Sequence, residues 1–94
     1  MLSQLPLDLA KVPADQIDRE ILRLGMIAEL DAVNLYEQLA AKTGNDKVRK
    51  VLLDIAKEEK THVGEFQALL LENDDEQVKE LVEGKKEVEE IDAK

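Results

Sequence analysis

Two long segments with helical periodicity, separated by a break of only a few residues, limit the folds that this chain can adopt. In residues 14–42 and 46–71, apolar side chains recur every three or four positions, which is the spacing of one face of an α-helix. Between them, Gly44 is typical of a helix C-terminus, and Asn45 or Asp46 can cap the helix that follows. A connection this short leaves the two helices antiparallel, so the sequence predicts an antiparallel two-helix hairpin.

A third, shorter helix is expected after the hairpin. Residues 72–75 (Glu-Asn-Asp-Asp) break the periodicity and can cap a helix that ends near Glu83. The inner side of this helix would carry three apolar residues, Val78, Leu81 and Val82. Gly84 should then interrupt the helical pattern.

The two ends of the chain lie outside the predicted helical domain, which covers residues 14–83. Residues 1–13 show no steady period and end in Pro13, which indicates an extended N-terminal arm. Residues 84–94 are interpreted as an acidic C-terminal extension, either a frayed helix or a linker. The predicted fold is therefore all-α, with an antiparallel two-helix hairpin and a short third helix.

Length and composition exclude several classes of protein. At 94 residues the chain forms at most one domain, and so small a domain gains stability from partners, metals or oligomerisation. It contains no cysteine, which excludes disulfides, thiolate zinc sites and iron–sulfur ligation. The net charge of −9 argues against a nucleic-acid partner and is compatible with attracting cations. The apolar stretch from Leu2 to Val12 is too short and too interrupted by Pro6, Asp8 and Lys11 for a signal peptide or a membrane span. We therefore expect a cytoplasmic protein without membrane contact.

The apolar surface of the first predicted helix is wider than one neighbour covers. It carries two adjacent stripes: Ile21, Gly25, Ala28, Ala32, Leu35 and Leu39, and next to them Leu22, Met26, Glu29, Val33, Tyr36 and Ala40. Ile27 and Leu30 widen this surface further. We therefore expect burial by more than one neighbour, which favours oligomerisation.

Three ionisable residues occupy positions where these stripes favour leucine or isoleucine. Glu29 lies in the first predicted helix, and Glu59 and His62 lie in the second. The main apolar stripe of the second helix, which contains both, consists of Val48, Leu52, Ile55, Glu59, His62, Phe66 and Leu69. Glu59 and His62 are three residues apart, so their side chains meet on one helix face. Glu29 precedes Gly44 by 15 residues and Glu59 follows it by 15, which places both at the same level of a hairpin. Because a buried charge requires a partner or a metal ion, this cluster is a candidate site.

Two interpretations of this cluster are open. In the first, His62 is a core or interface histidine paired with Glu59 or Glu29. In the second, the cluster binds metal, because carboxylate-bridged di-iron sites in helix bundles use a Glu from each of two helices and a Glu-x-x-His from each of two others. One hairpin supplies half of that set, and a two-fold contact with a second copy would complete it. Oxygen ligands with one imidazole per metal favour iron or manganese over a structural zinc.

Two further residues near this cluster have more than one possible role. Tyr36 is two turns from Glu29 on the same face, and is either a core aromatic residue or a ligand or hydrogen-bond donor at the edge of the metal site. Asp31 cannot share the face of Glu29, and is either a plain surface residue or a secondary metal-attracting carboxylate.

With these residues placed, the sequence resembles the encapsulated ferritin-like family, small rubrerythrin-related proteins housed in encapsulin nanocompartments. The resemblance is carried by AELDAVNLYEQ at residues 28–38 and EEKTHVGEFQALL at residues 58–70, and it covers roughly residues 17–83. It extends in particular to the ferritin-like domain that some archaea and bacteria fuse to the N-terminus of the shell protein. The C-terminus shows no recognisable apolar shell-targeting peptide, so the chain is expected to be the front of a shell fusion or to lack its targeting segment.

The resemblance implies a fold, an assembly and an activity. Members pair two-helix protomers with a short third helix into a ferritin-like four-helix bundle with a di-iron ferroxidase centre across the interface, and the pairs assemble into an annular decamer. Glu29, Glu59 and His62 match the iron ligands, and Tyr36 matches a tyrosine beside the iron. The implied function is oxidation of Fe(II) to Fe(III), supplying iron for storage inside a cytoplasmic encapsulin nanocompartment whose shell protein is the partner.

The match to a secondary metal site of some members is incomplete. Asp31 stands where that site has a glutamate, whereas Ala28 replaces a second glutamate and Leu35 replaces a tryptophan. Two other functions stay open. One is a rubrerythrin-like peroxidase, although this chain lacks the cysteines of a rubredoxin electron donor. The other is a non-enzymatic structural oligomer with an interfacial Glu/His pair.

Overall fold

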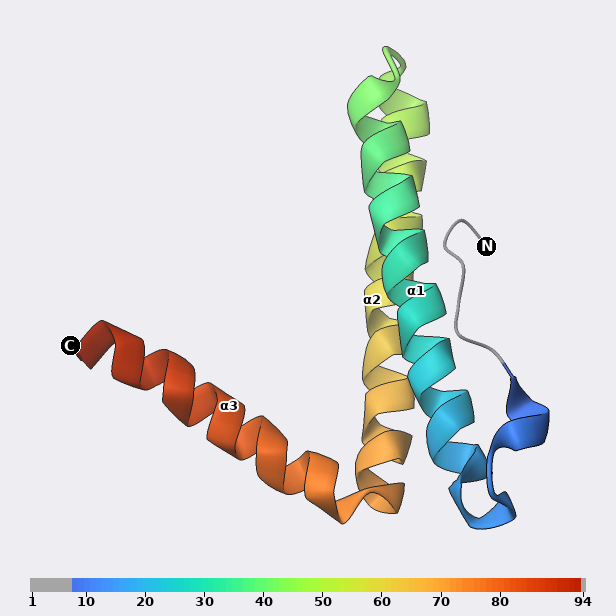
Figure 1. Ribbon diagram of the computed structural model, residues 1–94. Helices are drawn as coiled ribbons and strands as arrows, with labels where there is room; N and C mark the ends of the chain where they lie inside the picture. The colour runs from blue at the N-terminus through green and yellow to red at the C-terminus, as the bar shows by residue number, and fades with distance from the viewer. Residues whose placement is uncertain (1–7, 94) are drawn as a thin grey trace.

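The computed structural model describes residues 8–93, which contain three α-helices (Figure 1). α1 spans Ile17–Lys42, α2 spans Asp46–Asn73 and α3 spans Asp75–Ala93. α1 and α2 lie side by side as an antiparallel hairpin, whereas α3 points away from the end of α2 (Figure 1). The predicted all-α fold with a two-helix hairpin is confirmed. No helix among residues 8–93 is long and apolar enough to cross a membrane.

The turn between α1 and α2 is held by side chains that bind backbone groups left free at the helix ends. The Asn45 side chain accepts a hydrogen bond from a backbone N–H in the first turn of α2 at 3.1 Å, which makes Asn45 the N-cap of that helix. The Arg49 guanidinium donates to the carbonyl oxygens of Ala40 and Thr43, which have no partner within α1. Thr43 leaves α1 in an extended conformation, so Gly44 does not end the helix through a left-handed conformation.

The contact with α2 uses mainly one of the two stripes predicted on α1. Leu22, Val33 and Ala40 of this stripe are buried, whereas Ile21 and Leu39 of the other stripe remain exposed. Burial of the stripe that contains Leu22, Val33 and Ala40 is the main favourable contribution to packing of the hairpin. Gly25 of the other stripe also contacts α2, through the ring of Phe66, whereas Ile21 and Leu39 at the ends of that stripe stay exposed.

The face of α2 that packs against α1 differs from the predicted stripe. Ala56 and Leu70 are buried, whereas Val48 and Leu69 of the predicted stripe are exposed. The central members of the predicted stripe are half-buried, so the face of α2 that is buried against α1 is rotated from this stripe toward Ala56 and Leu70.

α3 is longer than predicted, because Gly84 does not interrupt it. The helix continues through Gly84, which has no positive φ, and ends at Ala93. A glycine within a helix costs about 1 kcal/mol relative to alanine, and the good helix formers on both sides of Gly84 outweigh that cost. Val78, Leu81 and Val82, predicted on an inner side, are exposed in the single chain because α3 leaves the hairpin. The prediction of a helix end near residue 83 is wrong.

A buried carboxylate at the junction between α2 and α3 connects all three helices. The side chain of Asp74 is only 6% exposed. One of its oxygens accepts a hydrogen bond from the backbone N–H of Gln77 in α3, and the other accepts one from the guanidinium of Arg23 in α1, both at 3.0 Å. The Gln77 bond, and after it the Arg23 guanidinium, hold the pKa of Asp74 below its usual range even though burial opposes this. These contacts stabilise the direction in which α3 leaves the hairpin.

The N-terminal segment differs from the predicted extended arm in its described part. Leu9–Lys11 and Ala14–Gln16 form single 3-10 turns, and α1 begins at Ile17, three residues later than the periodicity indicates. The part of the arm at residues 1–7 lies outside the described residues. The division of the chain at residues 13 and 83 into an arm, a helical domain and an extension stays a prediction.

Candidate metal centre

Glu29, Glu59 and His62 lie together at one level of the hairpin, in the middle of α1 and α2. One ligand atom from each side chain lies within 4.8 Å of the others. Within residues 8–93 this is the only group of three His, Cys, Asp or Glu side chains so placed. The equal separation of both glutamates from Gly44 explains their common level, since 15 residues rise by about 22 Å along either helix.

The imidazole of His62 lies between two carboxylates. Its Nδ1 atom is 3.4 Å from Glu29 Oε2 and 3.5 Å from Glu59 Oε2. The side chains of Glu29 and Glu59 are 21% and 19% exposed, and that of His62 is 43% exposed. One ring nitrogen with two carboxylate oxygens is a donor set that suits iron or manganese.

The environment of Glu29 Oε2 tests whether these residues fit a metal ion. This oxygen is buried, and it has no hydrogen-bond partner in the described part of the chain, since the nearby Nδ1 of His62 does not approach it with hydrogen-bond geometry. A buried polar atom without a partner costs about 1–3 kcal/mol, and more when it is charged. A bound cation would offset this cost, so the residues present fit a metal ion.

The other residues singled out in the sequence lie outside this group. Tyr36 and Asp31 are both half-buried on α1, and neither belongs to the group that Glu29 forms with α2. Glu58 and Glu65 are exposed on α2. The role of Tyr36 at the edge of the site and that of Asp31 as a secondary metal-attracting carboxylate stay predictions.

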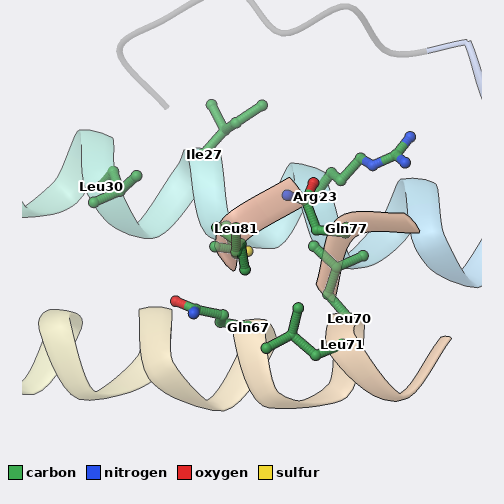
Figure 2. Close-up of a pocket in the computed structure, with 9 residues that line it drawn as sticks. Arg23, Ile27, Leu30, Gln67, Leu70, Leu71, Gln77 and Leu81 are labelled. Carbon is green, nitrogen blue, oxygen red and sulfur yellow. The ribbon is translucent and has the colours of Figure 1, made fainter. Parts of the chain in front are cut away.

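An apolar groove of about 390 Å³ lies where α3 leaves the hairpin. Side chains from all three helices line it (Figure 2), among them Ile27, Leu30, Leu70, Leu71 and Leu81, with Arg23, Gln67 and Gln77 as polar groups. None of the three candidate ligands lines this groove. Ile27 and Leu30 are the residues that widen the apolar surface in the sequence, but the groove itself depends on the direction of α3, which no sequence pattern indicates.

The sequence is similar to a known family and to known proteins. It matches the rubrerythrin family over residues 20–94. It is 64% identical over 72 residues to a ferritin-like–encapsulin shell fusion protein of Pyrococcus furiosus, covering 77% of this chain and 21% of that protein. It is 37% identical over 78 residues to the encapsulin nanocompartment cargo protein EncC of Myxococcus xanthus, covering 77% of this chain and 60% of that protein. The matched segments thus cover about one fifth of the length of the Pyrococcus furiosus protein and about three fifths of the length of the Myxococcus xanthus protein.

A solved structure has the same fold. The crystal structure of the encapsulated ferritin domain from Pyrococcus furiosus matches this chain with a TM-score of 0.82 and 54% identity, covering 96% of this chain and 94% of that one. The resemblance to encapsulated ferritin-like proteins, drawn from two short segments, is confirmed over nearly the whole chain. This chain belongs to the rubrerythrin family of ferritin-like proteins.

Proposed function

We propose that this chain is a ferroxidase subunit, which oxidises Fe(II) to Fe(III) at a centre shared by two copies. The observation that carries the proposal is the group of Glu29, Glu59 and His62, in which one carboxylate oxygen is buried without a hydrogen-bond partner. Carboxylate oxygens with one imidazole suit iron. Membership of the rubrerythrin family and the ferritin-like name of a relative give independent support.

A second copy is required because one hairpin supplies only half of a di-iron ligand set. A two-fold contact would bring together Glu29, Glu59 and His62 of each copy, which completes the set known from helix bundles. Part of the His62 imidazole is exposed and accessible to such a copy. All three helices expose large apolar side chains, which support this interface and the assembly of pairs into an annular decamer: Ile27, Leu30, Leu39, Val51, Leu81 and Val82.

The proposed reaction moves one electron from each of two Fe(II) substrate ions to one two-electron acceptor. With O2 as acceptor, two Fe(II) ions and two protons yield two Fe(III) ions and one molecule of H2O2. Glu29 and Glu59 would hold both ions, because carboxylates favour Fe(III) and can change between bridging and terminal binding. His62 would be a terminal ligand, and Tyr36 would lie at the edge of the site as a ligand or hydrogen-bond donor.

The names of the relatives support a role inside a protein shell. One relative is a fusion with an encapsulin shell, and another is an encapsulin nanocompartment cargo protein. We therefore propose that this chain works inside an encapsulin nanocompartment in the cytoplasm, where it would supply oxidised iron for storage. Its net charge of −9 favours the approach of Fe(II) to the site.

A rubrerythrin-like peroxidase is the second candidate function, favoured by the family match. It would use the same ligands but H2O2 in place of O2 as the oxidant. Initial rates of Fe(II) oxidation with each oxidant at equal concentration separate the two functions. A rate that is much higher with H2O2 would favour the peroxidase.

Stopped-flow absorbance of Fe(III) formation in air tests the ferroxidase. Glu59→Ala and His62→Ala should each abolish rapid oxidation, because each removes a ligand. Glu58→Ala is a matched control, since this neighbouring glutamate is exposed and outside the group, and its rate should equal that of the wild type. A wild-type rate in Glu59→Ala or His62→Ala would show that the assignment is wrong. Wild-type protein without iron after aerobic loading would leave a structural oligomer as the function.

A further inference from the structure

Gly25 of α1 lies against the aromatic ring of Phe66 from α2. A Cβ atom placed on Gly25 would come within 2.8 Å of Cε1, 2.9 Å of Cζ and 3.0 Å of Cδ1 of that ring. Because real Cβ atoms essentially never approach other heavy atoms to less than 3.0 Å, the ring uses space that only a glycine leaves free. The other three glycines of the chain, Gly44, Gly64 and Gly84, have nothing within 4 Å of such an atom. Close packing against a side chain thus distinguishes Gly25.

Gly25 and Phe66 are each about one helical turn from a candidate metal ligand. Gly25 precedes Glu29 by four residues, and Phe66 follows His62 by four. Because α1 and α2 are antiparallel, both positions lie at the same end of the site, on the side from which α3 leaves (Figure 1). Long side chains in a helix point back toward its N-terminus, so Glu29 leans toward Gly25 and Phe66 leans toward His62. The ring of Phe66 therefore lies between the two helices at the α3 end of the site.

The burial of Glu29 Oε2 agrees with this placement. The Glu29 side chain is 21% exposed, yet this one oxygen is buried without a hydrogen-bond partner. The side chains around this oxygen keep water away from it, the His62 imidazole at 3.4 Å among them, and the Phe66 ring is the largest apolar group at that end of the site. Glycine is also among the poorest helix formers, so its presence within α1 opposes helix stability. A role of Gly25 and Phe66 in the site explains both the glycine within α1 and the buried oxygen of Glu29 that has no hydrogen-bond partner.

We propose that Gly25 and Phe66 are positioning residues of the site formed by Glu29, Glu59 and His62. This inference rests on the function proposed above. The bare backbone at Gly25 admits the ring, and the ring closes the α3 end of the site, excludes water from Glu29 Oε2 and limits rotation of the His62 imidazole. Neither residue supplies a ligand atom. Both hold the ligands in binding geometry before a metal ion arrives.

Titration of the full chain with Co(II) tests this inference, with the d–d absorption spectrum as the readout of coordination. Gly25→Ala should weaken Co(II) binding by about tenfold or more and change the spectrum, because the added methyl group displaces the ring. Gly84→Ala is a matched control, since it makes the same change within a helix but in open space. It should raise the Tm and leave both the affinity and the spectrum unchanged.

A double variant shows whether the glycine acts through the ring. Phe66→Leu should weaken Co(II) binding, and Gly25→Ala with Phe66→Leu should bind no more weakly than Phe66→Leu alone. If the losses of Co(II) affinity in the two single variants multiply in the double variant, the inference is overturned. It is also overturned if Gly25→Ala keeps the affinity and the spectrum of the wild type. If Gly25→Ala does not fold, wild-type affinity and spectrum in Phe66→Leu would overturn it instead.

The same titration separates this inference from the function on which it rests. Wild-type protein that neither binds Co(II) nor oxidises Fe(II) would overturn both. Wild-type protein that binds and oxidises, together with Gly25→Ala and Phe66→Leu variants that bind Co(II) as well as the wild type does, would overturn the positioning role alone.

Discussion

Replacing Glu29 by glutamine should stabilise the metal-free protein and remove its response to metal. Glu29 Oε2 is buried without a hydrogen-bond partner, and His62 Nδ1 at 3.4 Å belongs to a side chain that is 43% exposed, so its attraction is weakened by solvent. Leaving a buried polar atom unpaired costs about 1–3 kcal/mol and more when it is charged, so glutamine, which keeps the shape of the side chain but is neutral, lowers this cost without removing it. After allowing for the lost attraction to His62, we expect the free energy of unfolding to rise by about 1 kcal/mol.

Metal should reverse the order of the two proteins. A ligand that binds only the folded state stabilises it by about 2.7 kcal/mol when its free concentration is 100 times the Kd. The wild type should gain this stabilisation with Fe(II) under anaerobic conditions, whereas Glu29→Gln should gain almost none because it lacks one ligand. In a chain of this size, 1 kcal/mol corresponds to about 4–8 °C in Tm. The variant should therefore melt several degrees higher without metal and clearly lower with it.

Differential scanning calorimetry at a fixed protein concentration measures both halves of this prediction. The concentration is held constant because the proposed pairing of subunits would itself change the Tm. Glu58→Gln is a matched control, because this exposed neighbour should alter neither the metal-free Tm nor the shift with Fe(II). The reasoning is refuted if Glu29→Gln melts below the wild type without metal, or if Fe(II) raises its Tm as much as that of the wild type.

Two further predictions concern the joints between the helices. The Gln77 N–H and the Arg23 guanidinium lower the pKa of Asp74, so the stability it contributes is present above the ordinary aspartate value of 3.8 and is lost as the pH falls below it. Urea unfolding at pH 5 and pH 3 should show this loss, and an Asp74→Asn variant should lose less over the same interval. Asn45→Ala removes the cap of the Val48 N–H and should lower the free energy of unfolding by about 1 kcal/mol. A change of less than a few tenths of a kcal/mol in urea unfolding would contradict that role of Asn45.

The hairpin and the level of the candidate ligands follow from local rules. Each residue of an α-helix adds the same rise, so the equal separation of Glu29 and Glu59 from Gly44 was enough to bring both to one level. The spacing of three between Glu59 and His62 adds the imidazole to the same face. The sequence alone therefore determined the composition of the candidate centre, and its two motif segments indicated the family.

The rotation of α2 and the course of α3 were decided by tertiary structure. A helical stripe predicts that a helix has an apolar face, but the packing of α1 against α2 determines which side chains are finally buried, here Ala56 and Leu70. The direction of α3 depends on Asp74 and Arg23, which are 51 residues apart in the chain. Periodicity within one segment carries no information about such a pair.

The close packing of Gly25 against Phe66 shows the same limit within the candidate site. In the sequence, Gly25 is one small member of an apolar stripe and Phe66 is one large member of another. Only the separation and rotation of the two packed helices bring the ring onto the bare backbone. The sequence by itself thus determined which residues form the candidate metal site and at which level they lie. The tertiary structure decided how deeply Glu29 is buried and which side chain closes the site, because both depend on contacts between helices rather than on the geometry of one helix.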